Sequence, residues 1–182
     1  GSHTSYLYKN GWRGLNLDIS AETVEMFKIF RPKDISLVLG LSDKEGISDA
    51  YLNKDISTIS SINKNMVNVM GIQKYGIIRT IETTTLKDLR KKQNLEKINF
   101  LKIDCEGQDE LILSQSNIED LMSDFLSFEI IPTDISLRDE IEKKNEYLEF
   151  FKTQSFSRKI LDYFDHCNNC LLYTSPSPRD RG

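Results

Sequence analysis

Two carboxylates follow an apolar stretch of the sequence and are the first candidates for chemistry. The segment "NFLKIDCEGQDELIL", residues 99–113, runs from apolar residues into Asp104 and Glu106, then a glycine, then a helix-like pattern. This order predicts a buried strand that turns into a helix. A carboxylate at such a turn can accept backbone N–H groups at the helix start, or it can face a ligand as a general base or polar partner. Both interpretations fit the residues.

Other polar side chains also stand where the sequence predicts that strands end. Asp18, Ser42 and Glu129 each lie at or near the end of an apolar stretch. In an open parallel sheet, ligands bind in the crevice beyond the carboxyl ends of the strands. Asp18 precedes a predicted helix, and a carboxylate there can accept hydrogen bonds from both hydroxyls of a ribose. A plain acid that favours the helix dipole is the equally simple alternative.

The elements that would hold these side chains alternate between strand and helix. Residues 14–20 are predicted to form a strand, and Ser20 is expected to cap a helix that carries Glu22 in its first turn and ends near Arg31. Residues 35–42 are a continuous apolar run, which is typical of a strand buried on both faces of a parallel sheet. Strand, helix and strand in this order are the unit of a doubly wound fold.

The rest of the chain continues this alternation. A polar excursion with short strands is predicted over residues 47–75, and Thr85 and Asp88 are expected to open a short helix as a capping box. Further strands are predicted over residues 77–83, 99–105, 124–130 and 156–163, with a last helix over residues 137–151. The order predicts an α/β sandwich with a largely parallel sheet.

Composition limits the classes of function. The chain has 182 residues, of which 38% are hydrophobic and 29% charged, as in a globular protein of one domain. A net charge of −4 gives no general electrostatic attraction to nucleic acid or to an anionic membrane, so neither partner is expected. Three cysteines indicate no disulfide framework, and a cytoplasmic location is therefore predicted.

The end of the chain carries a different signature. Its "CLLYTSPSPRD", residues 170–180, resembles the one-frame translation of a transposase adaptor used in sequencing libraries. We therefore expect residues 170–182 to be adaptor-derived and residues 1–169 to be natural protein. A Ser/Pro-rich disordered tail is the alternative that composition permits. In the first case Cys167-x-x-Cys170 is no metal motif, and a closed zinc site would need four ligands in any case, so no metal is expected.

Four blocks of the sequence together resemble a known family. The blocks "GWRGLNLDIS", "LVLGLSDKEG", "TTTLKDL" and "INFLKIDCEGQDELIL" occur in the order found in the FkbM-type family of S-adenosylmethionine-dependent methyltransferases. The "F-L-K-I-D-x-E-G" pattern is the most specific, followed by "G-W-R-G-x-N-x-[D/E]". Cys105 departs from the family, which usually has an aliphatic residue there, and is interpreted as a small buried side chain.

The resemblance implies a Rossmann-like class I methyltransferase fold with S-adenosyl-L-methionine as cofactor. It places Asp18 on the cofactor ribose. It also places the turn of Leu41, Ser42 and Asp43 near the adenine. The family's first strand and glycine-rich turn would precede Gly1, so residues 1–169 are expected to be a partial methyltransferase domain that binds cofactor poorly by itself.

The resemblance also implies a reaction, O-methylation of a sugar, a polysaccharide or a natural product. It puts Asp104 and Glu106 where the methyl donor and the hydroxyl acceptor meet. In-line transfer depends on alignment of the reacting atoms, and a base must take the proton of the weakly nucleophilic hydroxyl. Asp104 is the first choice for this base and Glu106 the second.

Two other functions fit acids at strand ends. A nicotinamide-dependent Rossmann oxidoreductase also uses an acid after its second strand to hold a ribose. A non-catalytic family member could instead bind a glycan or a protein partner through the same crevice. Substitution of Asp104 and Glu106 separates these functions, because only a methyltransferase should lose methylation while it keeps its cofactor.

Overall fold

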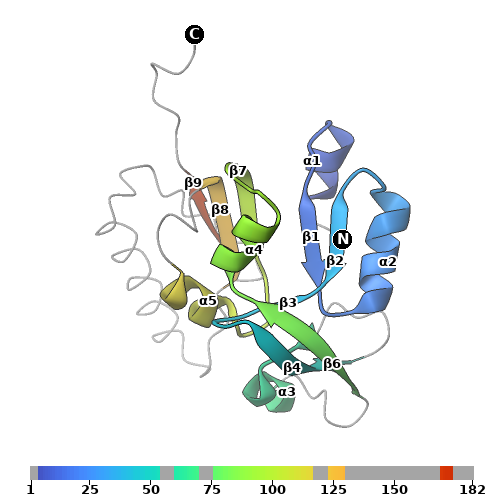
Figure 1. Ribbon diagram of the computed structural model, residues 1–182, viewed down its shortest axis with the longest axis vertical. Helices are drawn as coiled ribbons and strands as arrows, with labels where there is room; N and C mark the ends of the chain where they lie inside the picture. The colour runs from blue at the N-terminus through green and yellow to red at the C-terminus, as the bar shows by residue number, and fades with distance from the viewer. Residues whose placement is uncertain (1–3, 54–59, 70–75, 117–122, 130–168, 174–182) are drawn as a thin grey trace. The chain divides into compact units, whose positions relative to one another are not determined.

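The described residues alternate between helix and strand, which confirms the predicted mixed α/β class. The computed structural model describes residues 4–53, 60–69, 76–116, 123–129 and 169–173. They belong to two compact units, Gly1–Thr84 and Thr85–Gly182 (Figure 1). The described strands form three sheets in place of the one sheet that was predicted, with the orders β1-β2, β3-β6-β4-β5 and β7-β8-β9.

The first unit begins with a strand-helix-strand arrangement, as predicted. After the short helix α1 (Ser5–Lys9), β1 (Leu15–Asp18) runs parallel to β2 (Ile35–Val38), and Asp18 pairs with Val38. Helix α2 (Ala21–Phe30) connects the two strands and packs along them (Figure 1). This arrangement brings the end of β1 directly to the start of α2.

Helix α2 begins and ends where the sequence predicts. The Ser20 hydroxyl accepts the Thr23 N–H at 3.2 Å, Glu22 lies in the first turn, and Arg31 caps the last one. An N-cap serine satisfies a backbone N–H that would otherwise have no partner in the helix. The buried Val24 anchors the helix on the strands.

The predicted continuous strand over residues 35–42 is wrong. Strand β2 ends at Val38, and the chain then enters β3 (Gly40–Leu41), which pairs in parallel with β6 (Ile77–Thr84) in a different sheet. Nor is β2 buried on both faces, since Ile35 is 53% exposed and Val38 41% exposed. A hydrophobic run does not reveal where a strand changes its partner.

Close packing at Gly40 explains how β3 meets β6. A Cβ atom built on Gly40 would lie 2.9 Å from Ile81 Cδ1 and 3.1 Å from Thr83 Cγ2. Glycine inside a strand often marks such a close approach of two chain segments. The glycine thus allows the second parallel pair of this unit.

The predicted polar excursion over residues 47–75 contains short elements, as expected. Strand β4 (Gly46–Leu52) pairs antiparallel with β6 and with β5 (Ser60–Ser61), and helix α3 spans Lys64–Val69. The apolar side chains buried in this part of the unit are Ala50, Leu52, Met66, Val67 and Ile81.

Gly40→Ala is expected to lower the free energy of unfolding by about 1 kcal/mol, because the new methyl group overpacks the contact with Ile81 and Thr83. Gly46→Ala is the matched control, since its Cβ would meet only Thr83 Oγ1, at 3.9 Å. That control is expected to stay within about 0.5 kcal/mol of the unsubstituted protein. Urea unfolding of the full-length protein measures both, and equal effects would contradict the packing explanation.

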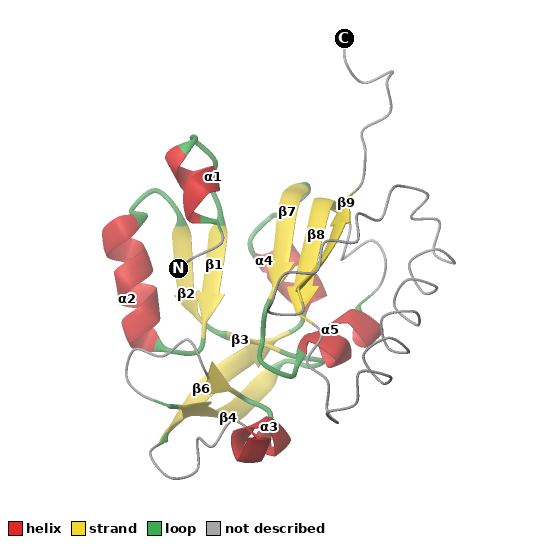
Figure 2. Ribbon diagram, turned by 180° about the vertical axis from the view of Figure 1, so that it is seen from behind, coloured by secondary structure: helices red, strands yellow, loops and turns green. Residues whose placement is uncertain are grey.

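The second unit carries the strand that precedes Asp104. Helix α4 (Leu86–Lys92) and helix α5 (Asp109–Gln115) flank β7 (Ile98–Ile103) in the sequence, and β8 (Ser123–Glu129) runs parallel to β7. Strand β9 (Asn169–Tyr173) pairs antiparallel with β8 (Figure 2).

The predicted helix start at Thr85 is confirmed, and Thr85 and Asp88 form the N-cap contact of a capping box. Thr85 Oγ1 accepts the Asp88 N–H at 3.0 Å and donates to Asp88 Oδ2 at 2.6 Å. The buried Leu86 and Leu89 follow on the inner side of this helix. Local sequence thus fixes the helix start in both units.

Three predictions concern parts of the chain beyond the described residues. The predicted helix over residues 137–151, the predicted strand over residues 156–163 and Cys167 lie outside the described residues. Cys170 lies within β9, and the adaptor origin of residues 170–182 stays a prediction.

None of the helices in the described ranges combines the length and the apolar composition that crossing a membrane requires. The cytoplasmic location stays a prediction.

Candidate functional site

Asp18 stands at the carboxyl end of β1, where it holds the turn into α2. Its Oδ1 atom accepts the Ser20 N–H at 2.8 Å, and the side chain is partly buried. Burial raises the pKa of the Asp18 carboxyl, whereas backbone hydrogen bonds from Ser20 and Ile19 lower that pKa. The simple structural role predicted for this acid is therefore real. A carboxylate can accept hydrogen bonds from several donors, so this structural role leaves Asp18 able to contact a ligand as well.

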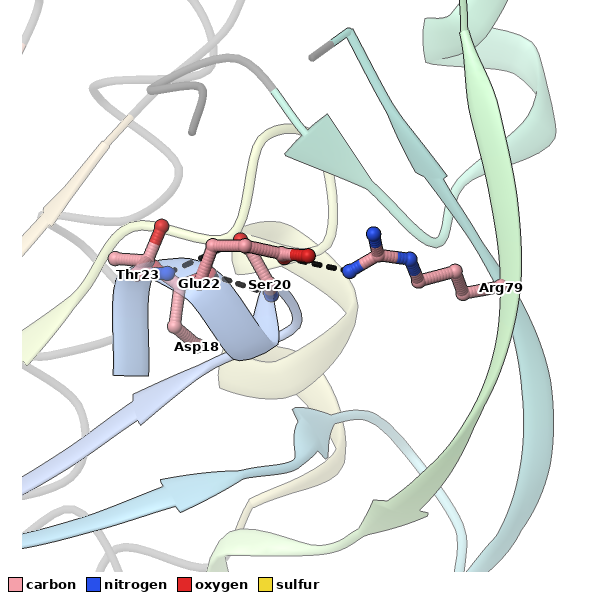
Figure 3. Close-up of polar contacts among 5 residues, drawn as sticks. All are labelled: Asp18, Ser20, Glu22, Thr23 and Arg79. Atoms are coloured by element: carbon pink, nitrogen blue, oxygen red, sulfur yellow. Dashed lines mark hydrogen bonds and ion pairs between the residues drawn. The ribbon is translucent and has the colours of Figure 1, made fainter. Parts of the chain in front are cut away.

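A chain of polar contacts leads from this turn to β6 (Figure 3). The Ser20 hydroxyl donates to Glu22 Oε2 at 3.2 Å, and Arg79 Nη1 donates to the same oxygen at 2.5 Å. The hydrogen bond from Arg79 is the main cause that lowers the pKa of Glu22 to about 2. The first turn of α2 is thus tied to a strand far away in the sequence.

The turn of Leu41, Ser42 and Asp43 lies in the same unit as Asp18. The Leu39 N–H donates to the Asp18 carbonyl at 3.1 Å, so the segment that leads from β2 to this turn passes beside the end of β1. The Ser42 N–H donates to the Thr84 carbonyl at 2.9 Å, and the Ser42 hydroxyl donates to Asp43 Oδ1 at 3.0 Å. Asp43 is exposed.

Asp104 follows β7 and forms an ion pair. Lys102 Nζ lies 2.9 Å from Asp104 Oδ2, and the Lys102 side chain is the more buried of the two. Asp104 is exposed as a residue. The ion pair therefore places a lysine ammonium group directly beside Asp104.

Glu106 has the more unusual surroundings. It is half-buried, and its backbone adopts φ +47°, followed by Gly107 at φ +89°. A non-glycine residue in the left-handed region costs about 1–2 kcal/mol, so the turn holds Glu106 against a local preference. Burial, and then the negative charges of Asp104 and Asp109, raise the pKa of Glu106 to about 7. A carboxyl with this pKa is suited to proton transfer near neutral pH.

Asp109 accepts a backbone N–H at the start of α5, a structural role that the sequence suggested for Asp104 or Glu106. Its Oδ2 atom accepts the Cys105 N–H at 2.9 Å, and the residue is only 3% exposed. An acid at the first position of α5 was the available signal, because acids at helix starts commonly accept nearby backbone N–H groups. Cys105, which was expected to be buried, is only partly buried.

Sequence reasoning missed three contributors, namely Lys102, Asp109 and Arg79. Lys102 lies two positions before Asp104, and this spacing puts two strand side chains on one face, so its pairing could have been anticipated. Arg79 is 57 residues from Glu22, and no local pattern links them.

The predicted site residues fall into the two units. Asp18 and the turn of Leu41, Ser42 and Asp43 belong to Gly1–Thr84, and Asp104 and Glu106 belong to Thr85–Gly182. The backbone of Glu129 ends β8. Within the described ranges, no group of three or more His, Cys, Asp or Glu side chains is arranged to hold a metal ion.

Comparison with known proteins identifies the family. The model of the methyltransferase FkbM domain matches residues 1–169, which include every predicted site residue. Searches of curated proteins and of solved structures give no significant match. The resemblance inferred from the four sequence blocks is confirmed, and it favours methyl transfer over nicotinamide-dependent oxidation. The chain belongs to the methyltransferase FkbM domain family.

Proposed function

We propose that this chain is the methyltransferase part of an S-adenosyl-L-methionine-dependent O-methyltransferase. Its acceptor is a hydroxyl of a sugar, a polysaccharide or a natural product. The observation that carries the proposal is the family match over residues 1–169. The half-buried Glu106, with its raised pKa, adds a candidate base for hydroxyl chemistry.

The fold proposed for the complete domain is the Rossmann-like class I methyltransferase sandwich. It is supported by the strand-helix-strand order around α2 and by the parallel pairing of β1 with β2, of β3 with β6 and of β7 with β8. In such sheets the carboxyl ends of the strands are the usual place for a ligand.

The groups at the end of β1 suit the nucleoside of the cofactor. The two ribose hydroxyls are donors, and the Asp18 carboxylate is an acceptor whose Oδ1 is oriented by the Ser20 N–H. The polar groups of Ser42 and Asp43 are candidates for contacts with the adenine. When bound, the cofactor supplies a methyl group on a positively charged sulfur.

Glu106 is proposed as the base that takes the proton of the acceptor hydroxyl. Its pKa of about 7 leaves a substantial ionised fraction at neutral pH and still makes it a better proton acceptor than an ordinary carboxylate. Asp104, paired with Lys102, is proposed to tune Glu106 through its charge. This assignment reverses the order in which the sequence ranked the two acids.

The test is methyl transfer by the full-length protein. Methyl-labelled cofactor is supplied with a panel of glycans and small hydroxyl compounds, and the Asp104→Asn/Glu106→Gln double variant is compared with the unsubstituted protein. We expect methylation to be lost in the variant while affinity for S-adenosylhomocysteine survives. Unchanged turnover would remove both acids from the mechanism. Cofactor binding without transfer to any acceptor would favour the non-catalytic alternative.

A further inference from the structure

We propose that Arg79 is a positioning residue for the cofactor-binding carboxylate of Asp18. It acts through Glu22 and Ser20, which fix the turn that orients that carboxylate. The inference rests on the proposed function, because it assumes that Asp18 binds the cofactor ribose. It adds a residue from β6, which neither the sequence blocks nor the comparisons single out.

The first link is the ion pair between β6 and α2. Arg79 Nη1 lies 2.5 Å from Glu22 Oε2, and the two side chains are 33% and 32% exposed (Figure 3). Partial burial weakens the screening that makes most surface ion pairs ineffective. Since the pKa of Glu22 is held at about 2, the pair stays charged throughout the pH range in which the enzyme would work. The first turn of α2 is therefore fastened to a strand.

The second link is the Ser20 hydroxyl. It donates to Glu22 Oε2 at 3.2 Å and accepts the Thr23 N–H at 3.2 Å, and Ser20 is fully buried. A hydroxyl that donates in one direction and accepts in another has a defined rotamer. The position of Glu22, set by Arg79, thus contributes to the conformation of residue 20.

The third link joins Ser20 to the ligand-facing acid. The Ser20 N–H donates to Asp18 Oδ1 at 2.8 Å, so the orientation of this peptide group contributes to the direction of the carboxylate. Burial raises the pKa of Asp18, and the hydrogen bond from Ser20 lowers that pKa, so this donor also favours the ionised carboxylate. Loss of Arg79 would therefore make the Asp18 carboxylate less well oriented toward the ribose and less strongly favoured in its ionised form.

The experiment measures binding, not turnover, in the full-length protein. Calorimetry gives the affinity for S-adenosylhomocysteine and for its 2′-deoxy analogue. The analogue lacks one of the two hydroxyls from which Asp18 would accept a hydrogen bond. Arg79→Gln removes the ion pair, and Arg79→Lys keeps a positive charge. Lys28→Gln is the matched control, because Lys28 forms a 2.6 Å ion pair with Glu25 on the same helix, with both side chains exposed.

We expect Arg79→Gln to weaken binding of S-adenosylhomocysteine about three- to tenfold, as for residues coupled in one hydrogen-bonded network. Binding of the 2′-deoxy analogue should fall less. The Arg79→Lys protein should keep most of its affinity for S-adenosylhomocysteine, and Lys28→Gln should change the affinity for neither probe. In an Asp18→Asn background, Arg79→Gln should have little further effect, because its action passes through Asp18.

Three results would overturn the proposal. The first is an equal loss for both probes. The second is a loss that adds fully to that of Asp18→Asn, and the third is unchanged affinity in Arg79→Gln. If Arg79→Gln does not fold, Glu22→Gln breaks the same ion pair with a smaller change and is judged by the same criteria. Failure of the unsubstituted protein to bind S-adenosylhomocysteine would instead reject the proposed function, and with it the role of Arg79.

Discussion

Glu106→Gln is expected to lower kcat for methyl transfer by about 10²- to 10⁴-fold, the usual contribution of a general base. Glutamine has the size of glutamate but does not take up the proton of the acceptor hydroxyl. The affinity for S-adenosylhomocysteine should change little, because the proposed cofactor contacts come from Asp18 and the turn of Leu41, Ser42 and Asp43. Steady-state kinetics and calorimetry on the full-length protein measure the two quantities.

The pH dependence gives an independent check on Glu106. Since the base must be ionised and its pKa is about 7, kcat/KM should rise as the pH increases through about 7 and then level off. Asp104→Asn removes one of the negative charges that raise this pKa, so the rise should move to lower pH while most of the activity remains. A larger loss of kcat in Asp104→Asn than in Glu106→Gln would make Asp104 the base.

Asp18→Asn is expected to weaken binding of S-adenosylhomocysteine by about ten- to a hundredfold, because hydrogen bonds to a charged acceptor contribute about 1.5–3 kcal/mol each. Asparagine keeps an oxygen that can accept the Ser20 N–H, so the turn into α2 should survive. At saturating cofactor, kcat should fall much less than affinity. Calorimetry and kinetics on the same preparation separate the two effects.

Thermal stability is the control for this substitution. Burial of the ionised Asp18 carboxylate is unfavourable, as its raised pKa indicates, so a neutral side chain should leave the melting temperature unchanged or slightly higher. Unchanged cofactor affinity in a stable Asp18→Asn protein would leave Asp18 only its structural role at the start of α2.

Features governed by neighbouring residues were predictable from the sequence. The caps at Ser20 and Thr85 involve a hydroxyl and an N–H three residues later, so local spacing is sufficient to specify them. The position of Asp18 at the end of a strand followed by a helix is local in the same sense. The four sequence blocks that resemble the family include these local features, so the family could also be predicted from the sequence.

Features governed by distant partners were not predictable. The run over residues 35–42 is apolar throughout, but its division into β2 and β3 depends on β6, which comes much later in the chain. The contact between Glu22 and Arg79 depends on the same tertiary arrangement. Asp104 was the first choice for the base and Glu106 the second, but both acids follow the strand end and the sequence does not show how buried each one is. The burial of Glu106 and the charges around it come from the tertiary structure.

A crystal structure of the full-length protein with S-adenosylhomocysteine tests the cofactor assignment most directly. We predict that the ribose hydroxyls lie within hydrogen-bonding distance of the Asp18 carboxylate, with the adenine beside Leu41, Ser42 and Asp43. A nucleoside bound elsewhere, with Asp18 in contact only with the backbone of its own turn, would contradict the proposed cofactor site.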